Sequence, residues 1–351
     1  SDVYKRQVTG GTGFLGYVTV KKLLERPDVH VKLLVLPGDQ MIQYAYEEVD
    51  VARGDICDVE FLREQIHEGD VVLHMAGIVD IGSGKRDQLY RVNVGGAKNI
   101  ADVCLEKGVK KLVYTSSVHT ILPLKGRQSM AEPKDFPVKK LVGDYAKSKA
   151  QATSYMFDKA KEGLPVTVVY PAGMIGPCDY LVSNTGQVIL DYIRGSLKAY
   201  VKGGYNFVDV RDVADGVLSA AEVGRNGEGY LLSGNYVSLR EMLSILNEKL
   251  GRSKLPVRVA RGLVRMVAPL VEFYYKLRRK KPIFSSYSMY TLSCNCNFDH
   301  SKAERELGFS VRPAKETLCD EVDWFLDHGY GKGGKKDDRK LRLPKKAASR
   351  M

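Results

Sequence analysis

The chain has 351 residues, of which 44% are hydrophobic and 27% charged, a composition typical of a globular protein with more than one structural part. No run of about 18 apolar residues predicts a membrane-spanning helix. The six cysteines are scattered, so we expect no metal site, and we expect free thiols in the cytoplasm. The net charge of +12 is concentrated in residues 252–281 and 331–351, which argues against a nucleic-acid-binding protein.

The first residues do not have the pattern of a buried strand. Lys5, Arg6 and Gln7 directly precede Val8, whereas a buried parallel strand is normally a near-continuous apolar run. We interpret residues 1–7 as non-native, translated from a sequencing adapter. We therefore expect that the natural first strand has lost most of its residues.

A glycine-rich turn follows, with Gly10, Gly13 and Gly16 spaced three residues apart. Glycine permits a tight turn and a close approach of the backbone to a pyrophosphate. The helical pattern after the turn would direct its first N–H groups and the positive end of its dipole at the phosphates. The turn therefore predicts a nucleotide site.

From Val8 to Val169, short β-rich runs alternate with amphipathic stretches. Alternation of this kind predicts an α/β protein with a doubly wound parallel sheet and right-handed crossovers. The expected strands are 29–36, 70–77, 110–117 and 164–171, and the expected helices are 16–26, 59–67, 93–107 and 145–162.

Tyr145 and Lys149 form a YxxxK motif inside one of these helices. Residues four apart lie on the same helix face, so the phenol and the ammonium can converge. A free phenol has a pKa of about 10, and a nearby ammonium is expected to lower it toward neutral pH. The strand about 28 residues earlier ends in Ser116 and Ser117, either of which could hold a substrate oxygen beside the tyrosine.

Beyond Pro177 the pattern is less regular. A return of the chain to the sheet is expected at 206–216 and 229–234, which predicts a second part interleaved with the first. Residues 262–284 combine apolar and basic side chains, either as a lid helix over the substrate, which Pro269 favours, or as an interfacial helix on an anionic membrane. The other expected helices are 183–195, 239–250 and 261–279.

The glycine turn TGGTGFLG and the motif YAKSK together resemble the extended short-chain dehydrogenases/reductases, the NAD-dependent epimerase/dehydratase superfamily. The resemblance runs from Val8 to about Tyr330. It implies a Rossmann domain over 8–177 and 206–235 and a smaller, interleaved C-terminal substrate domain over 178–205 and 236–330. The remaining residues, 331–351, form a basic tail that we expect to be disordered. The resemblance leaves the oligomeric state open between a monomer and a homodimer, the latter being common in the family.

The same resemblance implies roles for the site residues. Ser117 orients the substrate, with Ser116 as second choice; Tyr145 is the acid/base; Lys149 binds the nicotinamide ribose; and Asn93 supports them. Asp55 would accept from the adenine amino group, whereas His74 is expected to be a structural strand-end histidine. The cofactor-binding residues that the resemblance implies are Gly10, Thr12, Gly13, Phe14, Leu15, Gly16, Asp55, Ile56, Ala76, Gly77, Thr115, Tyr145, Lys149, Pro171 and Gly173.

The choice of nicotinamide depends on the end of the second strand. NAD enzymes carry an acidic residue there that accepts from the ribose 2′-hydroxyl. Leu36 lies near this position, with no arginine for a 2′-phosphate, and Asp39 lies slightly beyond, from where it could reach back. The missing acid favours NADP over NAD.

The residues around Ser117 indicate which reaction to expect. The family's dehydratases have Thr-Asp-Glu where this chain has Ser116-Ser117-Val118, and its epimerases have Val-Tyr-Gly where it has Val118-His119-Thr120. The chain is more similar to the dihydroflavonol-reductase and 3β-hydroxysteroid-dehydrogenase branch. That branch implies interconversion of a small-molecule ketone and a secondary alcohol. The alternatives are an epimerase that uses the same site with NAD and a non-catalytic NADP-binding sensor.

Overall fold

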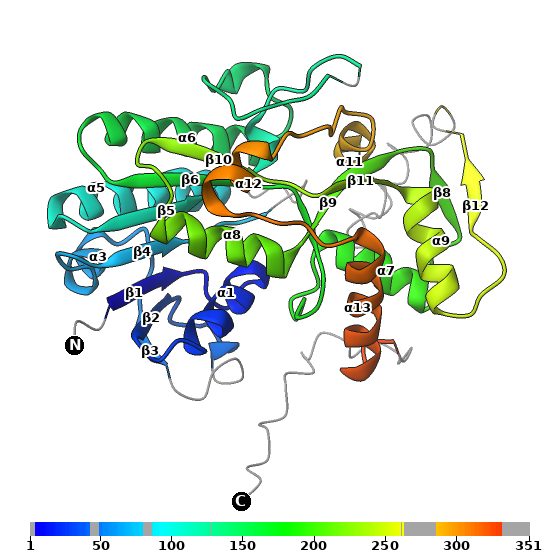
Figure 1. Ribbon diagram of the computed structural model, residues 1–351, viewed down its shortest axis with the longest axis horizontal. Helices are drawn as coiled ribbons and strands as arrows, with labels where there is room; N and C mark the ends of the chain where they lie inside the picture. The colour runs from blue at the N-terminus through cyan, green and yellow to red at the C-terminus, as the bar shows by residue number, and fades with distance from the viewer. Residues whose placement is uncertain are drawn as a thin grey trace, which may run out of the picture.

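A sheet of seven parallel strands forms the centre of the protein (Figure 1). The computed structural model describes residues 4–42, 49–79, 86–126, 128–260, 262 and 286–331. The strands of the central sheet are β1 (Tyr4–Thr9), β2 (Val29–Val35), β3 (Asp50–Arg53), β4 (Val71–His74), β5 (Lys111–Thr115), β6 (Val166–Pro171) and β10 (Glu228–Leu232).

The order of the strands reverses in the middle of this sheet. It runs β10-β6-β5-β4-β1-β2-β3, and every neighbouring pair is parallel. The chain moves outward from β1 to β3 in one direction and from β4 to β10 in the other. This confirms the predicted doubly wound sheet and places a reversal point between β1 and β4, where sheets of this class bind ligands.

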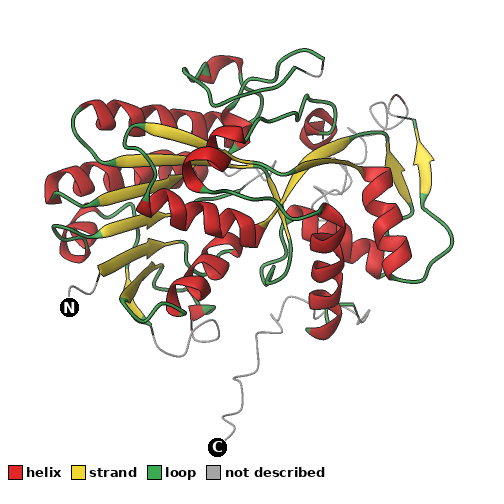
Figure 2. Cartoon of the chain, viewed as in Figure 1, coloured by secondary structure: helices red, strands yellow, loops and turns green. Residues whose placement is uncertain are grey.

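Helices pack on this sheet in two groups (Figure 2). α3, α5 and α6 pack in a row, whereas α1 packs against α8. Gly108 ends α5 with a left-handed φ of 65°, a conformation that glycine adopts without steric cost. The helices are α1 (Phe14–Leu24), α3 (Val59–Gln65), α5 (Ala97–Lys107), α6 (Asp144–Lys161), α8 (Val210–Glu222) and α12 (Ser301–Leu307).

Strand β1 contains the polar residues that we judged incompatible with a buried strand, and that expectation is wrong. β1 lies between β2 and β4 and pairs with both. Gln7 is 2% exposed, and its Nε2 donates to Asp70 Oδ2 at 3.0 Å, so the amide nitrogen is compensated, whereas its Oε1 has no hydrogen-bond partner among the described residues. Lys5 is exposed. The origin of residues 1–7 stays a prediction.

Residues 206–216 do not return to the central sheet. The first of them lie in β9 (Gly204–Asp209), which pairs with β7 (Gly173–Ile175) and β11 (Asn235–Ser238) in a separate three-stranded sheet; the rest begin α8. The expected return at 229–234 is confirmed, because β10 pairs with β6.

A smaller group of elements packs beyond the carboxyl edge of the central sheet (Figure 1). α13 contacts both α7 and α9. These helices are α7 (Asn184–Ile193), α9 (Leu239–Lys249) and α13 (Ala314–Asp327), and a two-stranded sheet pairs β8 (Ala199–Val201) with β12 (Val257–Val259). The short elements are α4 (Arg86–Tyr90), the π-helix η1 (Arg91–Gly96), the 3₁₀ turns η2 (Val118–Thr120) and η3 (Val138–Lys140), and α11 (Ser286–Thr291).

Two predicted features lie outside the described residues. They are the basic segment 262–284, apart from Gly262, and the tail 331–351, apart from Gly331. In the part of the chain that is described, no helix is long and apolar enough to cross a membrane. The predicted domain boundaries stay a proposal.

Candidate active site

The glycine turn lies at the reversal point, between the carboxyl ends of β1 and β4. Gly10 has a φ of 72°, and a Cβ there would lie 2.6 Å from the backbone nitrogen of Ala76. A Cβ on Gly16 would lie 2.0 Å from the carbonyl oxygen of Gly10. Since contacts of this length do not occur, only glycine fits either position. The turn therefore brings bare backbone to the edge of the sheet, as the sequence predicted.

Helix α1 begins directly after this turn. Its N-cap is Gly13, whose N–H donates to the Gly10 carbonyl at 3.0 Å. Gly13 has no side chain that could accept from the first N–H groups of the helix, those of Phe14 and Leu15. These N–H groups and the positive end of the helix dipole suit a phosphate. The turn therefore fits a nucleotide diphosphate.

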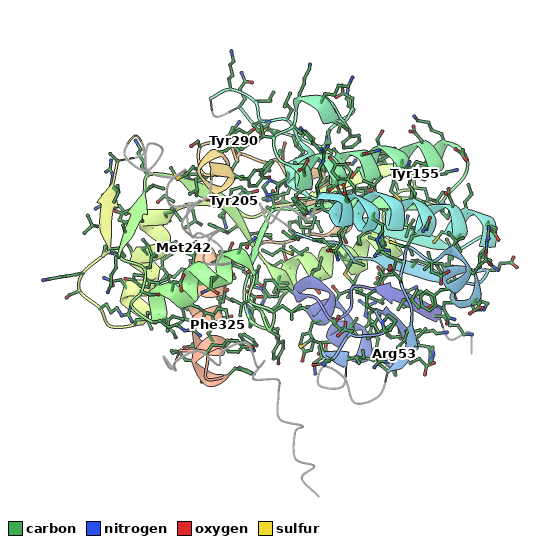
Figure 3. The ribbon with its side chains drawn as sticks, turned by 180° about the vertical axis from the view of Figure 1, so that it is seen from behind. Arg53, Tyr155, Tyr205, Met242, Tyr290 and Phe325 are labelled. Carbon is green, nitrogen blue, oxygen red and sulfur yellow. The ribbon has the colours of Figure 1, made fainter. Side chains whose placement is uncertain are left out.

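An acid and a base flank the turn on the β2–β3 side. The Thr12 hydroxyl donates to Asp39 Oδ2 at 2.5 Å, and Asp39 Oδ1 accepts from the N–H of Met41 at 2.8 Å. The exposed guanidinium of Arg53, which ends β3 (Figure 3), donates to the carbonyl of Asp39 at 3.3 Å. The sequence pointed to Asp39 but not to Arg53, because β3 was not foreseen.

Ser117 and Tyr145 meet at the carboxyl end of β5. Ser117 caps η2, where its Oγ accepts from the N–H of His119 at 3.3 Å, and its side chain lies close enough to Tyr145 to lower the pKa of the phenol. Ser116 faces elsewhere, since its Oγ is 2.6 Å from Thr153 Oγ1. The geometry therefore brings Ser117, rather than Ser116, to the tyrosine.

Burial raises the pKa of Tyr145, and the nearby Ser117 side chain opposes that rise. This is the reverse of the expected direction, because Lys149 turns its ammonium elsewhere: Nζ donates to the Thr115 carbonyl at 2.8 Å. Burial lowers the pKa of Lys149 to about 8. In the described structure Tyr145 is thus a neutral phenol, the form that can give up a proton.

The space around Lys149 is suited to a ligand. A Cβ on Gly77 would come within 3.3 Å of Lys149 Nζ, so the backbone at the end of β4 passes directly over the ammonium. The Thr115 hydroxyl is buried and finds no hydrogen-bond partner among the described residues. An unpaired buried hydroxyl is costly unless something binds it. Thr115 and Lys149 therefore fit the hydroxyl groups of a bound sugar.

Asn93 fastens the elements around the site. It lies in the π-helix η1, a form often found at functional sites, and its Oδ1 accepts from the N–H of Ile78 at 2.8 Å. Its Nδ2 donates to the Ile78 carbonyl at 3.0 Å and to Ser148 Oγ at 3.2 Å. Asn93 thus ties the segment after β4 to the helix that carries Tyr145.

The remaining sequence-predicted residues line the same edge. Asp55 Oδ1 accepts from the N–H of Cys57 at 2.9 Å, and Oδ2 pairs with Arg91 at 3.3 Å. His74 Nδ1 is 2.7 Å from Thr9 Oγ1, and burial lowers its pKa to about 3, as a structural histidine requires. The other members occupy strand ends or the turns that follow them: Ile56, Ala76, Pro171 and Gly173.

A cavity opens beside Tyr145 that the sequence did not reveal. Three of its polar members, His119, Tyr205 and Tyr287, come from η2, β9 and α11. The other polar members include Tyr290, Thr291 and Asn295, and the apolar members include Val118, Ile121, Met130, Leu141 and Phe298. His119 had been noted only as a departure from the epimerase pattern. Its position two residues after Ser117 was the one sequence feature that could have pointed here.

Comparisons with known proteins agree with the fold. The sequence profile of the 3-beta hydroxysteroid dehydrogenase/isomerase family matches residues 7–209. A protein of Synechocystis sp., provisionally named a dihydroflavonol 4-reductase, is 34% identical over 334 residues, which cover 93% of this chain and 95% of that protein. Sterol demethylase protein B of Methylococcus capsulatus is 30% identical over 92% of this chain and 98% of its own length. The crystal structure of gox2253 superposes with a TM-score of 0.81 at 29% identity, covering 94% of this chain and 99% of that one.

Proposed function

Because the chain belongs to the 3-beta hydroxysteroid dehydrogenase/isomerase family of extended short-chain dehydrogenases/reductases, we propose that it is a nicotinamide-dependent oxidoreductase that interconverts a ketone and a secondary alcohol. One observation carries the proposal: the Ser117 side chain lies close enough to Tyr145 to lower the pKa of the phenol, one helical turn from Lys149 and beside the cavity that His119 lines. The names of the relatives are consistent with a substrate built on an apolar ring skeleton.

The residues of the proposed site would have separate roles in cofactor binding, substrate binding and proton transfer. A bound nicotinamide would supply or accept the hydride. The glycine turn and α1 would hold its phosphates, and Lys149 with Thr115 would hold ribose hydroxyls. Ser117 would bind the substrate oxygen. Tyr145, kept protonated by burial, would donate its proton to that oxygen during reduction.

We propose that the nicotinamide is NADP, because of the two charged side chains beside the turn, Asp39 and Arg53. Both carboxylate oxygens of Asp39 already accept hydrogen bonds from Thr12 and Met41, whereas the exposed guanidinium of Arg53 lies at the same edge and can approach a 2′-phosphate. Titration with NADPH and NADH tests this choice. Arg53→Gln should weaken NADPH binding about tenfold and leave NADH binding nearly unchanged.

Nicotinamide absorbance with a panel of apolar ketones tests the reaction. Tyr145→Phe removes the proton donor and should lower kcat by about 10²- to 10⁴-fold. Ser117→Ala should cost about 10- to 100-fold. The matched control is Ser116→Ala, which leaves Thr153 bonded to the Lys149 carbonyl at 2.7 Å and should keep nearly full activity.

Three outcomes would replace this proposal. Full activity in Tyr145→Phe would remove the tyrosine from the reaction. Inverted product stereochemistry without net loss of reduced cofactor would indicate an epimerase. Tight cofactor binding without turnover of any ketone, alcohol or nucleotide-sugar would indicate a sensor.

A further inference from the structure

His119 joins two tyrosines from distant parts of the chain. Its Nε2 lies 3.0 Å from the hydroxyl of Tyr205, and its Nδ1 lies 3.1 Å from the hydroxyl of Tyr287. The ring also stands edge-on to Tyr145, with 5.8 Å between ring centroids. The imidazole thus uses both nitrogens to hold two phenols beside the proposed proton donor. We call these three residues the His–Tyr–Tyr cluster.

The rings of Tyr205 and Tyr287 each pack against the backbone of a glycine. A Cβ on Gly143, the N-cap of α6, would lie 2.5 Å from the ring of Tyr287, and a Cβ on Gly173 would lie 2.8 Å from the ring of Tyr205. Tyr205 lies on β9 close to α11, the helix that carries Tyr287 and Tyr290 (Figure 3). The rings therefore occupy sites shaped for them.

In the protonation state of the cluster, one of the two tyrosine O–H groups has no hydrogen-bond acceptor among the described residues. Burial lowers the pKa of His119 to about 4, so the ring is neutral near pH 7, with one N–H and one bare nitrogen. Burial also raises the pKa of both tyrosines, so each keeps its proton. One phenol must donate to the bare nitrogen, and the other must accept from the N–H. The phenol that accepts has a free O–H, and the described residues offer it no further hydrogen-bond acceptor.

The cavity around the cluster limits what that O–H can bind. Its described lining contains no lysine or arginine, and its members are apolar or uncharged polar residues. A substrate carboxylate or phosphate would be buried there without a cation, which is strongly unfavourable. A neutral carbonyl, hydroxyl or ether oxygen would satisfy the free O–H without that cost.

We propose that the His–Tyr–Tyr cluster is a second recognition site of the cavity, which binds a neutral oxygen of the substrate other than the reacting one. The proposal rests on the proposed function, because it assigns the reacting oxygen to Ser117 and Tyr145. It names the substrate class as an uncharged apolar molecule with two oxygens, of which one reacts and the other is held by a phenol that His119 orients.

Paired substrates test the cluster. The probes are rigid ketones that differ by one neutral oxygen and span different lengths: 2-decalone with decalindione, flavanone with 3-hydroxyflavanone, and 5α-androstan-3-one with 5α-androstane-3,17-dione. The wild type should favour the oxygenated member of at least one pair by roughly tenfold in kcat/KM, mainly through KM. Tyr205→Phe or Tyr287→Phe, whichever removes the donor, should abolish that preference.

Further variants distinguish recognition from a structural role. Tyr290→Phe, in the same cavity and on the same helix as Tyr287, is the matched control and should keep the preference ratio. His119→Phe should abolish the ratio, and His119→Gln, which retains a donor and an acceptor, should restore part of it. Because His119 is neutral, the ratio should stay flat from about pH 5.5 to 8.

Binding measurements separate failure of this proposal from failure of the proposed function. Calorimetric titration of the same pairs, without turnover, should show the preference even if no ketone is reduced. An equal affinity and an equal kcat/KM within every pair would overturn the His–Tyr–Tyr cluster as a recognition site. So would a preference that survives both Tyr205→Phe and Tyr287→Phe.

Discussion

The two sides of the site are assembled in different ways. On the proposed cofactor side, Gly10 lies in the turn and Gly16 in the first turn of α1, and Tyr145 and Lys149 lie on one helix, so sequence spacing alone brings each pair together. On the substrate side, His119, Tyr205 and Tyr287 come from three segments that only the folded chain brings together. Short-range motifs therefore assemble the proposed cofactor and proton-transfer residues, whereas the proposed recognition site is assembled by tertiary packing.

Gly16→Ala should have the largest effect, because it damages the cofactor side directly. The added Cβ would lie 2.0 Å from the Gly10 carbonyl oxygen, and both groups are backbone that cannot move aside cheaply. We expect a loss of roughly 2–4 kcal/mol in the free energy of unfolding and at least a hundredfold weaker binding of NADPH. Denaturant unfolding and fluorescence titration measure the two effects.

Gly38→Ala is the matched control for that change. A Cβ on Gly38 would meet nothing within 4 Å, so both quantities should stay near the wild-type values. If Gly16→Ala bound NADPH as well as Gly38→Ala does, the turn would not be the phosphate site.

Gly143→Ala should have a smaller effect, confined to the substrate side. The residue has a φ of 87°, and its added Cβ would lie 2.5 Å from the ring of Tyr287. With a ψ of 143°, this backbone lies outside the left-handed helical region, and a residue other than glycine there costs about 1–3 kcal/mol. Displacement of Tyr287 should raise KM for oxygenated ketones several-fold while NADPH affinity changes little. Steady-state kinetics and cofactor titration measure this separation.

Gly126→Ala separates the effect of backbone strain from the effect of the contact with Tyr287. Gly126 has a φ of 70°, yet a Cβ there would meet nothing within 4 Å. It should lose stability to backbone strain without the rise in KM. An equal rise in both variants would show that the substrate side responds to stability rather than to the position of Tyr287.

The sequence predicted the parts of the molecule that depend on local pattern. The apolar runs that became β2, β4, β5 and β6 and the YxxxK motif were located correctly. The membership of β9 in a separate sheet was missed, because strand pairing is not encoded in the strand itself. The direction of the Tyr145 pKa was wrong because burial, which raises it, depends on the whole fold.

The smallest expected effect concerns a buried carboxyl that supports the loop between the two sides. Glu321 is fully buried on α13, and its Oε2 accepts from the N–H of Gly176, just after β7, at 2.8 Å. Burial raises the pKa of Glu321 well above its ordinary value, with the Asp179 carboxylate adding to the rise, and burial raises the pKa of Asp179 to about 6.

These raised pKa values make stability fall with rising pH. A carboxyl whose pKa is higher in the folded state contributes its full stability below the unfolded pKa of about 4.3 and loses it as pH rises toward the folded pKa. Glu321→Gln keeps the acceptor for Gly176 and removes the titration. Its free energy of unfolding should match the wild type near pH 4.5 and exceed it by an amount that grows toward neutral pH. Glu316→Gln, an exposed change on the same helix, should follow the wild type throughout. A variant curve parallel to the wild type would show that Glu321 is compensated by groups outside the described residues.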